Sequence, residues 1–216
     1  MADSIFCSWS GGKDCCVALD KYLIENPGVN ISLLTMMDER HKTYGHFLNE
    51  KILNEQAGAM NLEINFGYSS FFDYEEKWSN ELRKLKKKGF TSGIFGDISL
   101  IEHYEWIGEI MKGVGMKMLM PLWKQDKQKI VLDFINRQYR AKIISINKTL
   151  MDPKYLGREI NTEIIDEFKK DGIDPCGEGG EFHTIVYDGP LFKSPLKLEL
   201  GAVIEEGDHV CYDLQL

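Results

Sequence analysis

The segment SWSGGKDC, residues 8–15, combines groups that are suited to binding phosphate. An apolar, strand-like stretch precedes it and a helical pattern follows it, so its glycines lie at a strand-to-helix turn. The first N–H groups of a helix lack partners within the helix, and the helix dipole favours an anion there. Glycines let the backbone approach that anion, while Ser8, Ser10 and Lys13 offer hydroxyl donors and a cation. The segment therefore predicts a polyphosphate site, which Asp14 would approach through a divalent cation such as Mg²⁺.

The spacing of the glycines excludes two common nucleotide motifs. The Walker A pattern G-x-x-x-x-G-K-S/T would place its first glycine at Cys7 and its hydroxyl residue at Asp14. The dinucleotide pattern G-x-G-x-x-G has its nearest match from Gly113, and that match ends on Met118. Cys15 leaves one alternative open, a reactive thiol, because helix N-termini favour the thiolate.

A second group of reactive side chains lies in DPCGEGGEFHTIVYDGPLF, residues 174–192. In a strand, Glu181 and His183 would share one face, where a carboxylate beside an imidazole can transfer protons or bind an amine. Cys176 and His183 alone provide too few ligands for zinc. On composition alone, a glycine-rich hairpin with solvated acids explains the segment equally well.

Composition limits the possible partners. The 216 residues carry a formal net charge of −8, with 43% apolar and 28% charged residues, which is typical of an ordinary globular protein. This balance argues against a nucleic-acid partner, which needs clustered Lys and Arg, and no apolar run approaches the roughly 20 residues of a membrane helix. The five cysteines are odd in number and form no C-x-x-C pair, so we expect no disulfide framework and a reducing, cytoplasmic setting.

Strand-like and helix-like segments alternate along the first two thirds of the chain. Strands are expected at 4–9, 29–37, 61–66, 90–98, 116–123 and 141–146, and helices at 14–25, 43–60, 72–88, 100–113 and 126–140. This alternation predicts a Rossmann-like α/β fold whose parallel sheet binds ligands beyond the carboxyl ends of its strands. Turn residues and short alternating segments after about residue 150 predict a smaller α+β portion. We therefore expect a nucleotide-binding domain at 1–125 and a substrate-binding portion at 126–216.

Several motifs carry a resemblance to known proteins. SGGKDC at 10–15 resembles the PP-loop of the ATP pyrophosphatases, which split ATP between its α- and β-phosphates. Further matches are GIFGDI at 93–98, PLW at 121–123, YLGREI at 155–160, PCGEGGEF at 175–182 and DGPLF at 188–192. Together these motifs resemble the diphthine–ammonia ligase family of PP-loop proteins. The resemblance implies an AMP-forming amide ligase, in which a carboxylate on elongation factor 2 is adenylated and ammonia displaces AMP.

The resemblance also implies roles for individual residues. It assigns Mg²⁺ binding to Asp14. It assigns ATP binding to Ser8, Ser10, Gly11, Gly12, Lys13, Asp14, Cys15, Gly96 and Asp97. The residues that it implies for the substrate pocket are Cys176, Gly177, Glu178, Gly179, Gly180, Glu181 and His183. The residues implied in catalysis are Lys13, Asp97, Glu178, Glu181 and His183.

Two departures from the family pattern leave the acyl substrate open. His183 stands where the diphthamide-making members usually have Glu, and SLIEHYEW at 99–106 stands where they carry an arginine. The His variant is similar to a second branch, suggested to act on small molecules, with cobalamin metabolism as one suggested setting. Glu102, His103 and Glu105 either contribute to the pocket or form the solvated side of a helix, and the second interpretation is favoured for the two acids. A thiolation or nucleotide-hydrolysing PP-loop enzyme, a non-catalytic nucleotide sensor and a homodimer also remain open.

Overall fold

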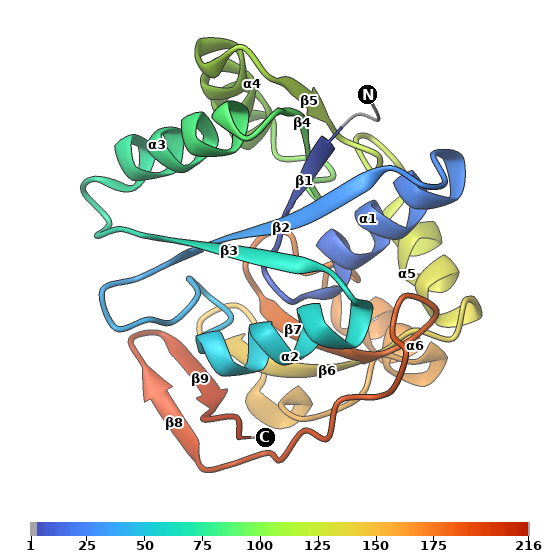
Figure 1. Cartoon of the computed structure of the whole chain (residues 1–216). Helices are drawn as coiled ribbons and strands as arrows, with labels where there is room; N and C mark the ends of the chain where they lie inside the picture. The colour runs from blue at the N-terminus through green and yellow to red at the C-terminus, as the bar shows by residue number, and fades with distance from the viewer. Residues whose placement is uncertain (1–3, 216) are drawn as a thin grey trace.

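The computed structural model describes residues 4–215, which form two β-sheets surrounded by helices (Figure 1). The first sheet is parallel, with strand order β3-β2-β1-β4-β5. Its strands are β1 (Ser4–Ser8), β2 (Asn30–Met37), β3 (Glu63–Tyr68), β4 (Phe90–Ile94) and β5 (Lys117–Leu119). The connecting helices are α1 (Lys13–Glu25), α2 (Glu50–Met60), α3 (Tyr74–Lys87) and α4 (Ile101–Val114).

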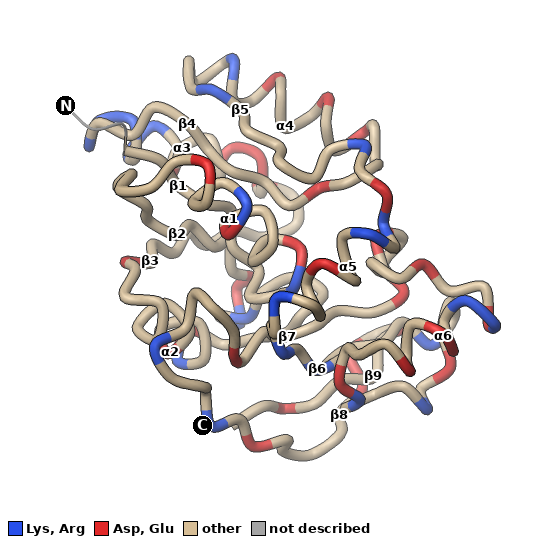
Figure 2. The backbone as a smooth tube through the Cα atoms, turned by 90° about the vertical axis from the view of Figure 1, so that its right-hand side faces the viewer, with Lys and Arg blue, Asp and Glu red and all other residues tan. Residues whose placement is uncertain are grey.

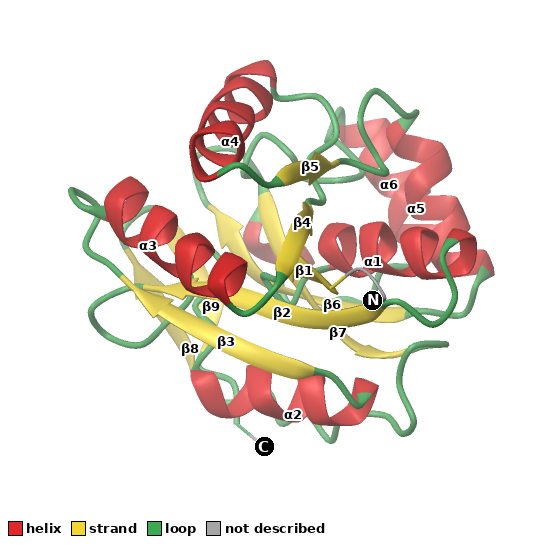
Figure 3. Cartoon of the chain, turned by 45° about the horizontal axis from the view of Figure 1, so that its top comes forward, coloured by secondary structure: helices red, strands yellow, loops and turns green. Residues whose placement is uncertain are grey.

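Helices cover both faces of the parallel sheet (Figure 3). On one face, α1 and α2 pack against Ile5, Cys7 and Leu33 in the larger core. On the other face, α3 and α4 pack against Phe6 and Leu34 in a separate core. Because β1 and β2 are covered on both faces, consecutive residues along them are buried instead of alternating with exposed ones, and most of these residues are apolar.

The second sheet is antiparallel and lies against the α1 and α2 side of the first. Its strands, in the order β7-β6-β9-β8, are β6 (Arg140–Asn147), β7 (Phe182–Asp188), β8 (Val203–Glu206) and β9 (His209–Tyr212). The other elements of this half are α5 (Lys127–Asn136), the 3₁₀ turn η1 (Pro153–Tyr155) and α6 (Thr162–Asp171). The larger core runs through both halves, and the proposed division at residue 125 lies between β5 and α5.

The predicted α/β fold class is confirmed, but two predicted elements are shorter than expected. The helix expected at 43–60 begins only at Glu50, because Gly45 and Phe47 have positive φ angles of 74° and 56°. Asn49 then caps α2 by accepting a hydrogen bond from the amide of Ile52 at 3.1 Å. The extended segment expected at 116–123 is a strand only at Lys117–Leu119, after which the chain turns.

Charged residues of both signs are interspersed along the chain (Figure 2). Three lysines gather in the last turn of α3, where cations complement the helix dipole. All five cysteines are buried and none forms a disulfide within residues 4–215. No helix in that described range is long and apolar enough to cross a membrane.

Candidate active site

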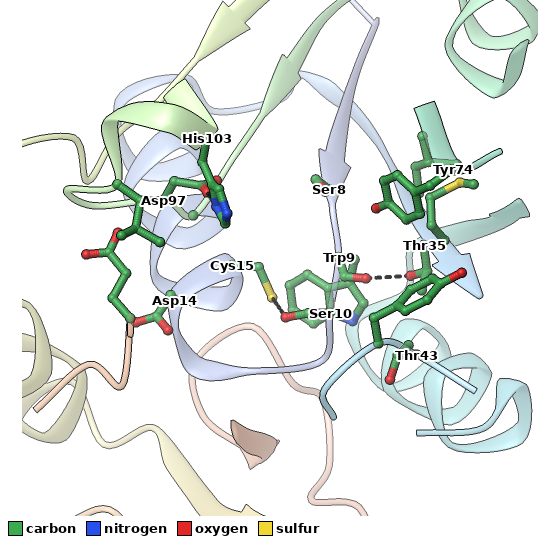
Figure 4. Close-up of a pocket in the computed structure, with 16 residues that line it drawn as sticks. Ser8, Trp9, Ser10, Asp14, Cys15, Thr35, Thr43, Tyr74, Asp97 and His103 are labelled. Carbon is green, nitrogen blue, oxygen red and sulfur yellow. Dashed lines mark hydrogen bonds and ion pairs between the residues drawn. The ribbon is translucent and has the colours of Figure 1, made fainter. Parts of the chain in front are cut away.

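A cavity of about 300 Å³ opens where the carboxyl ends of β1 and β2 meet the beginning of α1. In Figure 4, Asp14, Asp97 and His103 lie on one side of it and Thr35, Thr43 and Tyr74 on the other. The residues that line it are Ser8, Trp9, Ser10, Asp14, Cys15, Leu34, Thr35, Met36, Thr43, Tyr44, Tyr74, Gly96, Asp97, Leu100, His103 and Glu178. Its place at the carboxyl ends of parallel strands is the usual ligand site of an open α/β sheet.

The glycine loop leads into the beginning of α1, where the first helical amide, that of Lys13, donates to the Thr184 hydroxyl of β7 at 3.1 Å. Helices α2, α5 and α6 have Asn or Asp side chains that cap their first amides, whereas α1 has Gly12 at that position. Gly11 has a φ of 85°, which glycine adopts without strain. The Ser10 hydroxyl lies 3.3 Å from the Gly12 amide and 3.4 Å from the Cys15 thiol. Amides and hydroxyls are therefore gathered where an anion would bind.

The loop between β4 and α4, residues 95–100, closes the cavity by packing directly against the first turn of α1. A Cβ atom on Gly96 would lie 2.8 Å from the Cys15 amide nitrogen and 2.9 Å from the Asp14 carbonyl carbon. Only glycine allows two backbone segments to approach this closely. The contact places Asp97 beside the first turn of α1, as Figure 4 shows.

Gln56, on α2, connects the glycine loop to the second sheet. This fully buried amide accepts a hydrogen bond from the Trp9 indole at 3.0 Å and donates to the carbonyls of Gly11 at 3.0 Å and Val186 at 2.6 Å. The Val186 amide also donates to the Gly11 carbonyl, at 3.0 Å. The position of the loop therefore depends on β7 as well as on β1.

Replacing Gln56 with leucine is expected to lower the free energy of unfolding by about 3 kcal/mol, since it leaves buried groups of Trp9, Gly11 and Val186 without these partners. Chemical denaturation measures the loss, and Asn54→Leu, on the exposed side of the same helix, is the control. A Gln56→Leu protein as stable as the control would contradict this role.

Lys13 lies behind the loop and not in the cavity. Its ammonium group forms an ion pair with Asp14 at 2.9 Å, donates to the Cys176 carbonyl and lies 5.0 Å from the centre of the Phe182 ring. Burial alone would lower the pKa of Lys13, but the neighbouring Asp14 raises it overall, so the group stays charged. Lys13 therefore connects α1 to the glycine-rich motif at 174–183 through its bond to the Cys176 carbonyl.

Glu178 is the acid that this motif contributes to the cavity. Its carboxylate accepts hydrogen bonds from the amides of Ile98 at 2.6 Å and Ser99 at 2.7 Å, and pairs with Lys127 at 3.1 Å. Burial alone would raise the pKa of Glu178, but the bonds from Ser99, Ile98 and Lys127 lower it to about 2. Glu178 is therefore a fixed negative charge that fastens the motif to the β4–α4 loop.

Asp97 and His103 form a pair at the opposite wall. The imidazole Nδ1 of His103 lies 3.1 Å from the Asp97 carboxylate, and the ring is 59% exposed. The bond to Asp97 raises the pKa of His103 although partial burial opposes it. His103 also lines an adjoining cavity of about 510 Å³ between α3 and α4, whose walls include the rings of Tyr74, Trp78, Phe95 and Trp106.

The first turns of α4 contain both a solvated side and a residue that lines the cavity, so each of the two interpretations of Glu102, His103 and Glu105 holds for part of the set. Glu102 and Glu105 are exposed, as the solvated side of a helix would be, while His103 lines the cavity at the carboxyl ends of β1 and β2. Glu102 also reaches the edge of the adjoining cavity.

His183, from β7, belongs to a cluster of three imidazoles. Its ring centre lies 4.5 Å from that of His46 and 5.9 Å from that of His209. Burial lowers the pKa of His46 to about 4 and, together with the neighbouring imidazoles, lowers the pKa of His183 as well. No group of three His, Cys, Asp or Glu side chains within residues 4–215 has the geometry of a metal site.

The cluster predicts a loss of stability in acid. Because the folded pKa of His46 lies near 4 and the ordinary value is 6.5, the unfolded chain binds more protons between these limits, and stability falls as the pH falls through that window. We expect His183→Gln to reduce the steepness of this fall by up to about 1.4 kcal/mol per pH unit. Denaturation curves across the window measure it, and exposed His41→Gln is the control. Equal slopes for all three proteins would contradict this prediction.

The pKa values of the Cys15 and Cys176 thiols decide whether either thiol could act as a nucleophile. Burial raises the pKa of Cys15, and it raises that of Cys176 to about 12, so neither is a thiolate at neutral pH. The reactive-thiol alternative for Cys15 is therefore disfavoured.

One oxygen of Asp14 and one of Glu181 are buried without a hydrogen-bond partner among the described residues. The unpaired oxygen belongs to an Asp14 side chain that lines the cavity, so it fits a ligand to Mg²⁺.

The cavity gathers only some of the predicted residues. It brings together Ser8, Ser10, Asp14, Cys15, Gly96, Asp97 and Glu178. It leaves outside its lining Gly11, Gly12, Lys13, Cys176, Gly177, Gly179, Gly180, Glu181 and His183. Lining residues that the sequence did not single out as site residues are Trp9, Leu34, Thr35, Thr43, Tyr44, Tyr74 and Leu100. Met36, the next-to-last residue of β2, also lines it, and its place at the end of a strand was the available signal.

The fold and site define a class of protein: a Rossmann-like α/β protein with a PP-loop at the start of its first helix. Family models agree with this. The model for the diphthamide synthase N-terminal domain matches residues 4–118, and that for the diphthamide synthase C-terminal domain matches residues 126–212. The chain belongs to the diphthamide synthase family.

Individual relatives extend the comparison. A diphthine–ammonia ligase from Rattus norvegicus is 31% identical over 226 residues, covering 92% of this chain and 84% of the rat protein. One from Schizosaccharomyces pombe is 27% identical over 211 residues, which is 93% of this chain but only 32% of the yeast protein. Among solved structures, the U34-tRNA thiolase NcsA from Methanococcus maripaludis superposes with a TM-score of 0.37 and 12% identity, over 62% of this chain and 55% of that one.

Proposed function

We propose that this chain is an ATP-dependent, AMP-forming ligase that makes an amide from a carboxylate and ammonia. In the proposed reaction, a carboxylate oxygen attacks the α-phosphate of ATP and pyrophosphate leaves. Ammonia then attacks the acyl carbon, loses a proton, and releases AMP. The observation that carries this proposal is one cavity lined both by the loop and first turn of α1, through Ser10, Asp14 and Cys15, and by Glu178 from the glycine-rich motif.

The residues present support specific roles. The amides and hydroxyls of residues 8–15 would bind the phosphates, and Gly96 with Asp97 would close the site over them. Mg²⁺, held by Asp14, would supply positive charge to the phosphates. Every one of these groups is held in place by the fold, so catalysis would come from positioning and charge stabilisation.

The glycine-rich motif would hold the acyl substrate and the nitrogen source. The buried oxygen of Glu181 that lacks a partner is an acceptor suited to ammonium. Cys176, the glycines beside it and His183, which lie outside the lining of the described cavity, would form the surroundings of this acyl site. The relatives' name suggests diphthine on elongation factor 2 as the acyl substrate. A small carboxylate is the second candidate, because His183 departs from the usual pattern of the diphthamide-making members. Free, protonated thiols support a cytoplasmic setting for either reaction.

The test is AMP formation with defined acceptors. The chain is incubated with Mg²⁺, ATP and ¹⁵N-ammonium, and with either elongation factor 2 that carries diphthine or a panel of small carboxylates. The proposal expects pyrophosphate exchange that needs the carboxylate alone, and AMP release with ¹⁵N in the amide when ammonium is added. AMP release that needs a sulfur donor would favour thiolation instead, and nucleotide binding without any turnover would favour a sensor.

A further inference from the structure

The charge of the nucleotide cavity does not match a polyanionic ligand. Its lining includes three carboxylates, those of Asp14, Asp97 and Glu178, and none of its lining residues is Lys or Arg. A triphosphate in this cavity therefore faces negative groups that must be neutralised before it can bind.

Each of the three carboxylates has a different cationic partner. Asp14 pairs with Lys13 at 2.9 Å, Glu178 with Lys127 at 3.1 Å, and Asp97 with His103 at 3.1 Å. Lys13 is only 3% exposed behind the loop, and Lys127 also pairs with Asp174. Neither lysine lines the cavity, whereas the half-exposed His103 does.

Building on the proposed function, we propose that His103, protonated and held by Asp97, is the side-chain cation that contacts the phosphates of the bound nucleotide. Nε2 of the imidazolium is left to donate a hydrogen bond to a phosphate oxygen when Nδ1 bonds to Asp97. When the His103 ring loses this proton, Nε2 can no longer donate to the phosphate, and the negative charge of Asp97 is no longer balanced by the imidazolium.

The surroundings of His103 favour the protonated ring. Asp97 faces it from the β4–α4 loop, Glu178 from the glycine-rich motif and Glu102 from its own helix, and all three raise its pKa against the effect of burial. Asp14 of α1 and Tyr74 of α3 line the same cavity. A raised pKa means that the cation is present at neutral pH and is lost as the pH rises through that value.

A purely structural role gives a different expectation. His103 lies in the first turn of α4, where the helix dipole disfavours a cation, so its charge does not stabilise the helix. A structural histidine would change the stability of the protein when replaced, but not the pH dependence of nucleotide affinity.

The experiment is calorimetric titration of the full chain with a non-hydrolysable ATP analogue and Mg²⁺, at about pH 6 and about pH 8.5. The proteins are the wild type, His103→Gln, His103→Arg and the control His41→Gln, which replaces an exposed histidine outside the cavity lining. Ionisation of the nucleotide itself affects all four alike. The proposal predicts that, beyond this common effect, the wild type and His41→Gln lose roughly tenfold in affinity at the higher pH, equivalent to about 1.4 kcal/mol. His103→Gln binds weakly and His103→Arg tightly at both pH values.

Two results would overturn the proposal. Equal pH dependence in the wild type and His103→Gln would show that the imidazole charge does not reach the ligand, as would weak binding by His103→Arg. Thermal unfolding of each variant confirms that it is folded. Absence of nucleotide binding by every protein, wild type included, would instead remove the proposed function together with this inference.

Discussion

Lys13→Ala is expected to slow AMP formation by about a hundredfold and to lower the free energy of unfolding by about 2–3 kcal/mol. The lysine is buried, and its removal leaves the Asp14 carboxylate and the Cys176 carbonyl without their cation. The cost is below that of a fully buried pair, since the Asp14 side chain is 32% exposed. The first turn of α1 and the glycine-rich motif would then separate, and displacement of phosphate-binding groups by about 1 Å costs roughly a hundredfold in rate.

The same helix offers a matched control for this variant. Lys21, two turns further along α1, bonds to the Gln125 side chain at 2.8 Å, and its removal is expected to cost less than about 1 kcal/mol. Denaturation with urea and an assay of AMP formation measure both effects. If Lys13→Ala were as stable and as active as Lys21→Ala, the contact between α1 and the motif would have no part in the site.

Gly96→Ala is expected to weaken nucleotide binding by at least about tenfold, equivalent to about 1.4 kcal/mol. The new Cβ would lie within 3 Å of two backbone atoms of Asp14 and Cys15, at 2.8 and 2.9 Å, and neither can move without moving α1. The β4–α4 loop must therefore shift outward and carry Asp97 away from the phosphates. Such overpacking also lowers stability, by about 1–3 kcal/mol.

Gly113→Ala provides the contrasting substitution. Gly113 lies within α4, and a Cβ there would have no heavy atom within 4 Å beyond its neighbours and helix backbone. Alanine is expected to stabilise this helix by up to about 1 kcal/mol without changing affinity. Calorimetry and thermal unfolding of both variants make the comparison. Nucleotide binding by Gly96→Ala at wild-type strength would contradict the close approach of the two segments.

The features that the sequence predicted are local ones. The strand, the two glycines and the helix around Gly11 and Gly12 follow from the rules for phosphate loops, which need only adjacent residues. The alternation of apolar strands and helices predicts the parallel sheet in the same way. Glu178 was identified from its motif, and the structure adds its contact with the β4–α4 loop.

The features that escaped prediction depend on contacts between distant segments. Gln56 looks like an ordinary polar helix residue in the sequence, yet it connects Trp9, Gly11 and Val186. The position of Lys13 behind the loop could not be read from its place after two glycines, because it depends on the Cys176 carbonyl 163 residues away. Turns at positive φ, such as Phe47, likewise overrode a helical pattern.

The central claim is that the amino end of α1 holds the triphosphate of a nucleotide. A crystal structure of the chain with Mg²⁺ and a non-hydrolysable ATP analogue tests it most directly. The account predicts phosphate oxygens within hydrogen-bond distance of the amides and hydroxyls of residues 8–15, beside Gly96 and His103. A nucleotide seated elsewhere, with the glycine loop free of phosphate, would contradict it.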